Sequence, residues 1–205
     1  MEPIAEDEIW RIVPPIAYDS PIKYYKSDSE DLVIDTNNFI DLLSQLPENG
    51  LGVNVDEMHF PHRLSEKAVR NFKTILKSYG SSNKLIVPLI VLEEAERVAN
   101  YDRNLQKYER VRSVIQAMAL HPELPLWNAF FFEPLSQDIL ECFIQLYEGL
   151  YSFHTEKQHL LGLGDAIILA HGIYNRCPIA SNEWFEKHDW QAVAEIFPYL
   201  ELKDN

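Results

Sequence analysis

The sequence predicts an α/β protein with a mostly parallel central sheet of four to five strands, flanked by helices. Short apolar runs that end in polar residues alternate along the chain with longer segments whose apolar residues recur every three or four positions. The first pattern is typical of buried strands and the second of helices. Their alternation indicates βαβ units, which build parallel sheets with both faces covered.

Length and composition fit one folded domain. Of the 205 residues, 46% are hydrophobic, which is enough for a full core and too many for a disordered chain. Residues 1–30 stand apart because four prolines alternate there with aromatic residues. We expect an irregular N-terminal arm over 1–30 and the domain itself over 31–205.

The first half of the chain predicts two strands, each followed by helical segments. Asp35 ends the first apolar run, Ser65 is a good N-cap, and Gly80 is a typical helix stop. In order, we expect a strand at 32–35, a helix at about 38–46, a loop at 47–64, a helix at 65–79, a strand at 84–87 and a long helix from Pro88 to about 120, with a break near 100–104.

The second half repeats this alternation with shorter segments. Thr155 and Gln158 resemble a capping box, and Ser136 and Asp165 stand at helix starts. In order, we expect a strand at 129–133, a helix at 136–147, a short helical piece near 155, a helix at 165–175, a strand at 178–181, a helical turn from 183 and an edge strand at 199–203.

Net charge limits the partners of the chain. A net charge of −14 argues against general nucleic-acid binding. Residues 63–112 nevertheless hold 11 Lys or Arg and six Asp or Glu, so a basic stretch lies within an acidic protein. This stretch is either a set of solvated helix faces or a surface that follows a phosphate backbone. The nucleic-acid-binding candidates are Arg63, Lys67, Arg70, Lys73, Arg97 and Arg103.

Cysteine content and hydropathy indicate the compartment. The two cysteines, Cys142 and Cys177, form no CxxC pair, as expected for a reduced intracellular protein. No apolar run approaches the roughly 20 residues that a membrane-spanning helix needs. The acidic N-terminal residues are unlike a signal peptide. We therefore expect a cytoplasmic protein with no membrane partner.

Four acidic residues follow predicted strands or begin predicted helices. They are Asp35, Glu94, Asp165 and Glu183. Because ligands bind beyond the carboxyl ends of parallel strands, we expect these side chains to lie together. Clustered carboxylates repel one another unless cations neutralise them, and oxygen ligands select Mg²⁺ or Mn²⁺. Taken singly, each acid could instead cap a helix or lie in its first turn, where the helix dipole favours an anion.

These residues carry a resemblance to a known family. Asp35-Thr36-Asn37, Glu94 within VLEEAER, Asp165 within LGLGDAIILAHG and Ser181-Asn182-Glu183 resemble, in order and spacing, the four motifs of PIN-domain ribonucleases, which include the VapC-type toxins. The resemblance covers about residues 32–203. It implies a three-layer PIN-like fold and a metal-dependent endoribonuclease that uses Mg²⁺ or Mn²⁺, with the four acids as catalytic metal ligands and with Asn37 and Ser181 in supporting positions.

The resemblance also implies partners and leaves alternatives open. It implies an RNA substrate. The partners left open are an antitoxin or another protein, and a second copy of the chain in a homodimer. Glu183 stands where the family more often has Asp, Glu93 competes with Glu94 for the second position, and the chain is longer than a typical toxin. The alternatives are a structure-specific nuclease that processes DNA flaps, rRNA or tRNA, and a PIN-fold binding module in which Glu183 no longer supports turnover.

Overall fold

The computed structural model of the chain describes residues 31–60, 64, 66–101, 106–154, 162–175, 177 and 179–180; side chains are described at these positions except 66–68 and 148–154. The elements within this part of the chain alternate as the sequence predicts. They are β1 (Leu32–Ile34), α1 (Thr36–Leu43), α2 (Glu66–Lys77), β2 (Leu85–Pro88), α3 (Leu89–Tyr101), α4 (Gln106–Leu120), the 3-10 helix η1 (Pro125–Ala129), β3 (Phe130–Glu133), α5 (Gln137–His154), α6 (Leu163–Asn175) and β4 (Ile179–Ala180).

The four described strands form one parallel sheet in the order β3-β2-β1-β4. The two central strands, β1 and β2, are buried along their whole length. This explains their continuous apolar sequence, because a parallel sheet is covered on both faces. Since all strands run the same way, the residues that follow them gather at one edge of the sheet.

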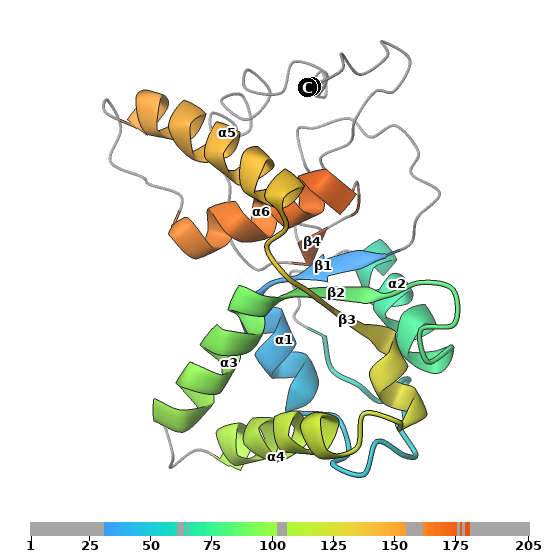
Figure 1. The fold of residues 1–205 in the computed structure, drawn as a ribbon. Coiled ribbons are helices and arrows are strands. Elements are labelled where there is room, and N and C mark those ends of the chain that lie inside the picture. Colours follow the sequence, from blue (N-terminus) through green and yellow to red (C-terminus); the bar gives the residue numbers. More distant parts are fainter. Residues whose placement is uncertain are drawn as a thin grey trace.

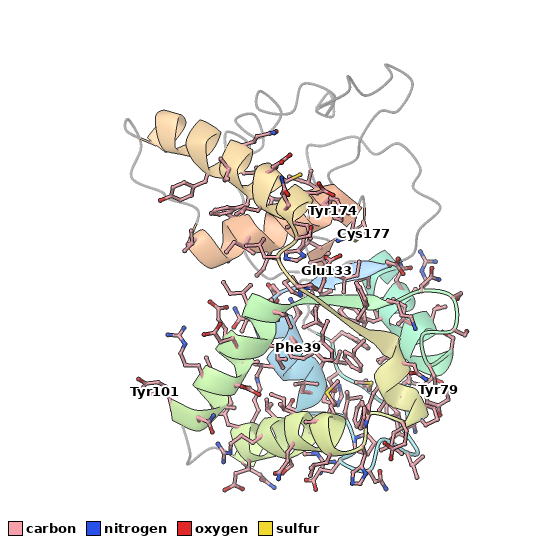
Figure 2. The ribbon with its side chains drawn as sticks, viewed as in Figure 1. Phe39, Tyr79, Tyr101, Glu133, Tyr174 and Cys177 are labelled. Carbon is pink, nitrogen blue, oxygen red and sulfur yellow. The ribbon has the colours of Figure 1, made fainter. Side chains whose placement is uncertain are left out.

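Helices cover both faces of this sheet (Figure 1). The pair α5 and α6 lies on one face, and α1, α3 and α4 lie on the other. Below the sheet, the ring of Phe39 in α1 meets Phe130 of β3 edge-on, with 6.3 Å between ring centroids (Figure 2). The core therefore has two layers, one on each side of the strands.

The α/β class, the parallel sheet and the three layers are confirmed, and each described strand lies within two residues of its predicted range. The prediction that Pro88 begins a helix is wrong, because Pro88 is the last residue of β2 and pairs with Glu133. A strand tolerates proline at a position where its missing N–H is not needed. The helix at 38–46 begins earlier, at Thr36, because Asp35 caps it.

Several predictions lie outside the described residues: the arm at 1–30, the helical piece near 155, the turn from 183 and the strand at 199–203. The predicted long helix appears as α3 and α4, with 102–105 between them outside the described part. None of the helices in the described part of the chain is long and apolar enough to span a bilayer.

Candidate active site

Asp35 lies at the carboxyl end of the sheet and begins α1. It is 5% exposed, and its side chain caps the helix by accepting a hydrogen bond from the backbone N–H of Asn38 (2.8 Å). Its own backbone N–H donates to the carbonyl oxygen of Ala180, the last residue of β4 (3.0 Å). Capping and sheet pairing therefore fix this carboxylate between the ends of β1 and β4.

Asn38 supports Asp35 directly, which the sequence analysis missed. Its amide nitrogen Nδ2 donates to Asp35 Oδ1 (2.9 Å) and to the carbonyl oxygen of Ala180 (3.2 Å), and the residue is 3% exposed. Asn37, the predicted supporting residue, is exposed, and its role stays a prediction. The signal for Asn38 was present: it lies one turn before the buried Leu42, so a polar side chain occupies a core-facing position of α1.

Glu94 is held against the start of α1. The hydroxyl of Thr36 donates to Glu94 Oε2 over 2.6 Å, which joins residues 58 positions apart. Glu93 is exposed, whereas Glu94 is half-buried, so the structure turns Glu94 toward the residue next to Asp35. The suggestion that Glu94 lies in the first helical turn is wrong: α3 begins at Leu89, its first turn contains no acid, and the dipole at the helix start does not explain Glu94.

Asp165 lies in the first turn of α6, as predicted, and two glycines make room around it. A Cβ atom on Gly164 would lie 3.2 Å from Glu94 Oε1, so the absence of a side chain lets α3 approach the start of α6. A Cβ atom on Gly162 would lie 2.9 Å from Asp165 Oδ2. Glu94 is therefore next to Thr36 on one side and to Gly164, the neighbour of Asp165, on the other.

The donors at this edge are of the kind that hard divalent cations select. Asp35, Glu94 and Asp165 offer oxygen atoms only, and the Gly162–Gly164 segment leaves space beside two of the carboxylates. Among the described residues, no three His, Cys, Asp or Glu side chains are close enough together to hold a metal ion. Glu183 and Ser181 lie outside the described residues. The described part thus fits a metal site in ligand chemistry, and the metal itself stays a prediction.

The basic candidates divide between two helices. Arg70 is exposed and Lys73 half-buried on α2, and Arg97 is exposed on α3, one turn after Glu94. Arg63, Arg103 and the side chain of Lys67 lie outside the described part. Figure 1 shows α2 and α3 on opposite sides of α1. Other basic residues of the stretch pair with acids: Lys77 with Asp56, Lys107 with Asp41 and Arg110 with Glu48.

Comparison with known proteins gives one structural likeness. A chain in the crystal structure of VapBC2 from Rickettsia felis, bound to a DNA fragment from their promoter, is 14% identical and covers 74% of this chain and 87% of its own length, with a TM-score of 0.44. At that level the likeness carries no conclusion about activity. No protein-family model matches the chain, and no curated protein matches it.

Proposed function

We propose that this protein is a metal-dependent endoribonuclease that hydrolyses RNA phosphodiester bonds. The catalytic metal ligands would be Asp35, Glu94, Asp165 and Glu183. One observation carries the proposal. Glu94 makes a 2.6 Å hydrogen bond to Thr36, beside Asp35, and its other oxygen lies against Gly164, beside Asp165. Glu94 thus lies beside the sequence neighbours of two other acids, which are 59 and 71 positions away from it in the chain, at the carboxyl end of a parallel sheet, where α/β proteins bind ligands.

The chain's own residues would hold and orient the ligands. Asp35 is fixed by the two donors of Asn38, and Glu94 by the hydroxyl of Thr36. Bound Mg²⁺ or Mn²⁺ would polarise a phosphoryl oxygen and lower the pKa of a coordinated water. Supporting hydrogen bonds of this kind orient ligands and typically change metal affinity or activity by about 10–100-fold.

Adjacent residues provide the sharpest test. Glu94→Gln is expected to lower cleavage of a fluorescent RNA in Mn²⁺ by at least about 100-fold, because loss of a ligand should exceed the loss of a supporting partner. Glu93→Gln, the matched control on the exposed side of the same helix, should cleave like wild type. Equal activity of the two variants would remove Glu94 from the site.

Asp35→Asn separates charge from helix capping. Asparagine caps a helix about as well as aspartate, so the variant should keep its melting temperature while losing activity. Mn²⁺ should raise the melting temperature of wild type and leave that of Asp35→Asn unchanged, since only a folded state that binds the ion gains stability. Cleavage that persists in EDTA would contradict the metal mechanism.

RNA preference and the toxin role rest on the resemblance of the four motifs and stay predictions. Matched single-stranded RNA and DNA, flap DNA and tRNA substrates would separate the ribonuclease from a structure-specific nuclease. Binding without cleavage of any of them would favour the binding module. Purification of the chain together with a small protein encoded beside it would support an antitoxin partner.

A further inference from the structure

A buried polar cluster joins the end of β3 to α6. Oxygen Oε2 of Glu133 lies 2.6 Å from His171 Nδ1 and accepts a hydrogen bond from Asn175 Nδ2 over 2.7 Å. Asn175 Nδ2 also donates to the backbone oxygen of His171 (2.9 Å). Glu133 is 7% exposed and His171 1% exposed. Figure 2 shows Glu133 between the sheet and the layer of α5 and α6.

This cluster takes no part in the proposed metal site, yet it is costly to bury. A carboxylate in the interior is strongly destabilising unless charged or polar partners satisfy it. Here both contacts converge on one carboxyl oxygen of Glu133, which lies at hydrogen-bonding distance from His171 Nδ1 and accepts from Asn175 Nδ2. Breaking the arrangement leaves buried polar atoms without a hydrogen-bond partner. The cluster therefore fixes where α6 lies relative to β3.

The same helix carries Asp165, and the sheet constrains it from both edges. β3 and β4 are the outer strands of the described sheet. His171 contacts Glu133 of β3, whereas Gly172 lies so close to β4 that a Cβ atom there would be 2.6 Å from the Ile179 side chain. At the other end of the helix, Gly164 lies against Glu94. A small displacement of α6 would therefore change the distance between Asp165 and Glu94.

We propose that Glu133 is a positioning residue: with His171 and Asn175 it holds α6 in the position on the sheet where Gly164, next to Asp165, lies against Glu94. The proposal rests on the metal site proposed above. It assigns no contact with RNA or metal to Glu133. The neighbouring strand residue Pro88 pairs with Glu133, and β2 lies next to β1, so Glu133 at the end of β3 and Asp35 just after β1 lie at the same edge of the sheet.

Three variants test the proposal. Glu133→Gln keeps the shape of the side chain and removes its charge, and Asn175→Ala removes one donor from a half-buried position. Ile173→Val is the matched control, because it weakens the packing of the same helix without touching the cluster. We expect the first two to lower Mn²⁺ affinity about tenfold by calorimetry and to leave the KM for RNA unchanged. Ile173→Val should bind Mn²⁺ like wild type at a similarly lowered melting temperature.

Hydrogen exchange separates this proposal from the proposed function. Backbone amides of residues 163–168 should exchange faster in Glu133→Gln and Asn175→Ala than in Ile173→Val, with or without metal. Wild-type exchange and Mn²⁺ affinity in a folded Glu133→Gln, or equal losses in Ile173→Val, would overturn the positioning role. If Glu133→Gln does not fold, Asn175→Ala decides by the same criteria. If wild type binds no Mn²⁺, the proposed function fails, and the exchange comparison still decides whether Glu133 fixes the start of α6.

Discussion

At Asn38 a single amide group connects the candidate ligand Asp35 with β4. Its Nδ2 donates to Asp35 and Ala180, so Oδ1 faces away from both acceptors and has no partner among the described residues. Reversing the amide would turn its oxygen toward a carboxylate, which the charges forbid. The orientation of this amide therefore follows from chemistry alone, and a second carboxylate here should be poorly tolerated.

Asn38→Asp is expected to lower the free energy of unfolding by about 2 kcal/mol or more at pH 7, because two donors are lost and two carboxylates face each other. Repulsion raises the folded-state pKa of the new carboxyl, so its penalty grows as pH rises above the unfolded pKa of about 4. The loss should be smaller at pH 5. Denaturant titrations at both pH values check this. Asn38→Leu, which also removes the donors but adds no carboxyl group, is the control. Equal losses of unfolding free energy in Asn38→Asp at pH 5 and pH 7 would contradict the prediction.

The two cysteines differ in burial and should differ in reactivity. Burial raises the pKa of the fully buried Cys177 thiol well above its ordinary range. Partial burial also raises the pKa of the Cys142 thiol, by a smaller amount. A thiol reagent at pH 8 should therefore modify Cys142 slowly and reach Cys177 only in denaturant, because the thiolate is the reactive form. Mass spectrometry of the labelled peptides identifies the order, and early labelling of Cys177 would contradict it.

The raised pKa of Cys177 predicts that the stability of the protein depends on pH. Because the folded pKa of Cys177 is raised, its contribution is present below the unfolded pKa of about 8.5 and is lost as pH rises above that value. Wild type should therefore lose more stability than Cys177→Ala between pH 8 and pH 10. Parallel losses in denaturant titrations would show that Cys177 does not contribute.

Among the contacts between elements, Gly80 fixes how the end of α2 meets the end of η1. Its φ is +66°, and a Cβ atom would lie 2.3 Å from the carbonyl oxygen of Asn128 and 2.6 Å from Ala129 Cα. Both neighbours are backbone, which cannot rotate away. Gly52 has a similar φ of +68° with nothing within 4 Å of a Cβ atom. The two glycines share a left-handed conformation, which is unstrained for glycine and strained for alanine, and Gly80 alone of the two has a close contact.

Gly80→Ala is therefore expected to cost at least about 3 kcal/mol of unfolding free energy, because strain adds to a clash with backbone. Gly52→Ala should cost only about 1 kcal/mol, the penalty of a left-handed conformation without the clash. Urea denaturation of both variants measures the difference. Equal losses would mean that the segment around Asn128 moves to accept the methyl group.

For the molecule as a whole, Arg97 and Lys84 form a test and control pair for nucleic-acid binding. Arg97 follows the carboxyl end of β2, and Lys84 precedes its amino end. Arg97 is exposed on α3, one turn beyond Glu94. Lys84 precedes β2 at the amino end of the sheet, where its ammonium donates to the backbone oxygen of Asn128 (2.5 Å). The protein carries a net charge of −14, so phosphate binding depends on where its few exposed cations lie.

If RNA follows α3 away from the site, Arg97→Gln should weaken RNA binding and reduce the slope of log K against log salt by about one, since one phosphate contact is lost. Lys84→Gln should leave the slope unchanged. Binding is measured in the Asp35→Asn background, which prevents cleavage. An unchanged slope for Arg97→Gln would show that Arg97 lies on a solvated face.

The order and pattern of residues predict the architecture and the positions of Asp35 and Asp165 on it. Buried strands such as Leu32–Ile34 can be recognised from a few consecutive residues, because a strand covered on both faces must be apolar at every position. Asp35 ends such a run, and helix caps follow from adjacent residues, so both are visible within a few positions. The α/β class then follows from the order of elements without knowledge of any contact.

Which side chains meet depends on how the elements pack against one another. Glu94 rather than Glu93 faces Thr36, Asn38 rather than Asn37 holds Asp35, and Glu133 pairs with His171. Each choice depends on the angle at which one helix packs on another element, which the helical repeat of a single segment does not fix. The contacts of Glu94 and Glu133 join residues 58 and 38 positions apart, and they form because close packing brings these polar groups within hydrogen-bonding distance of one another.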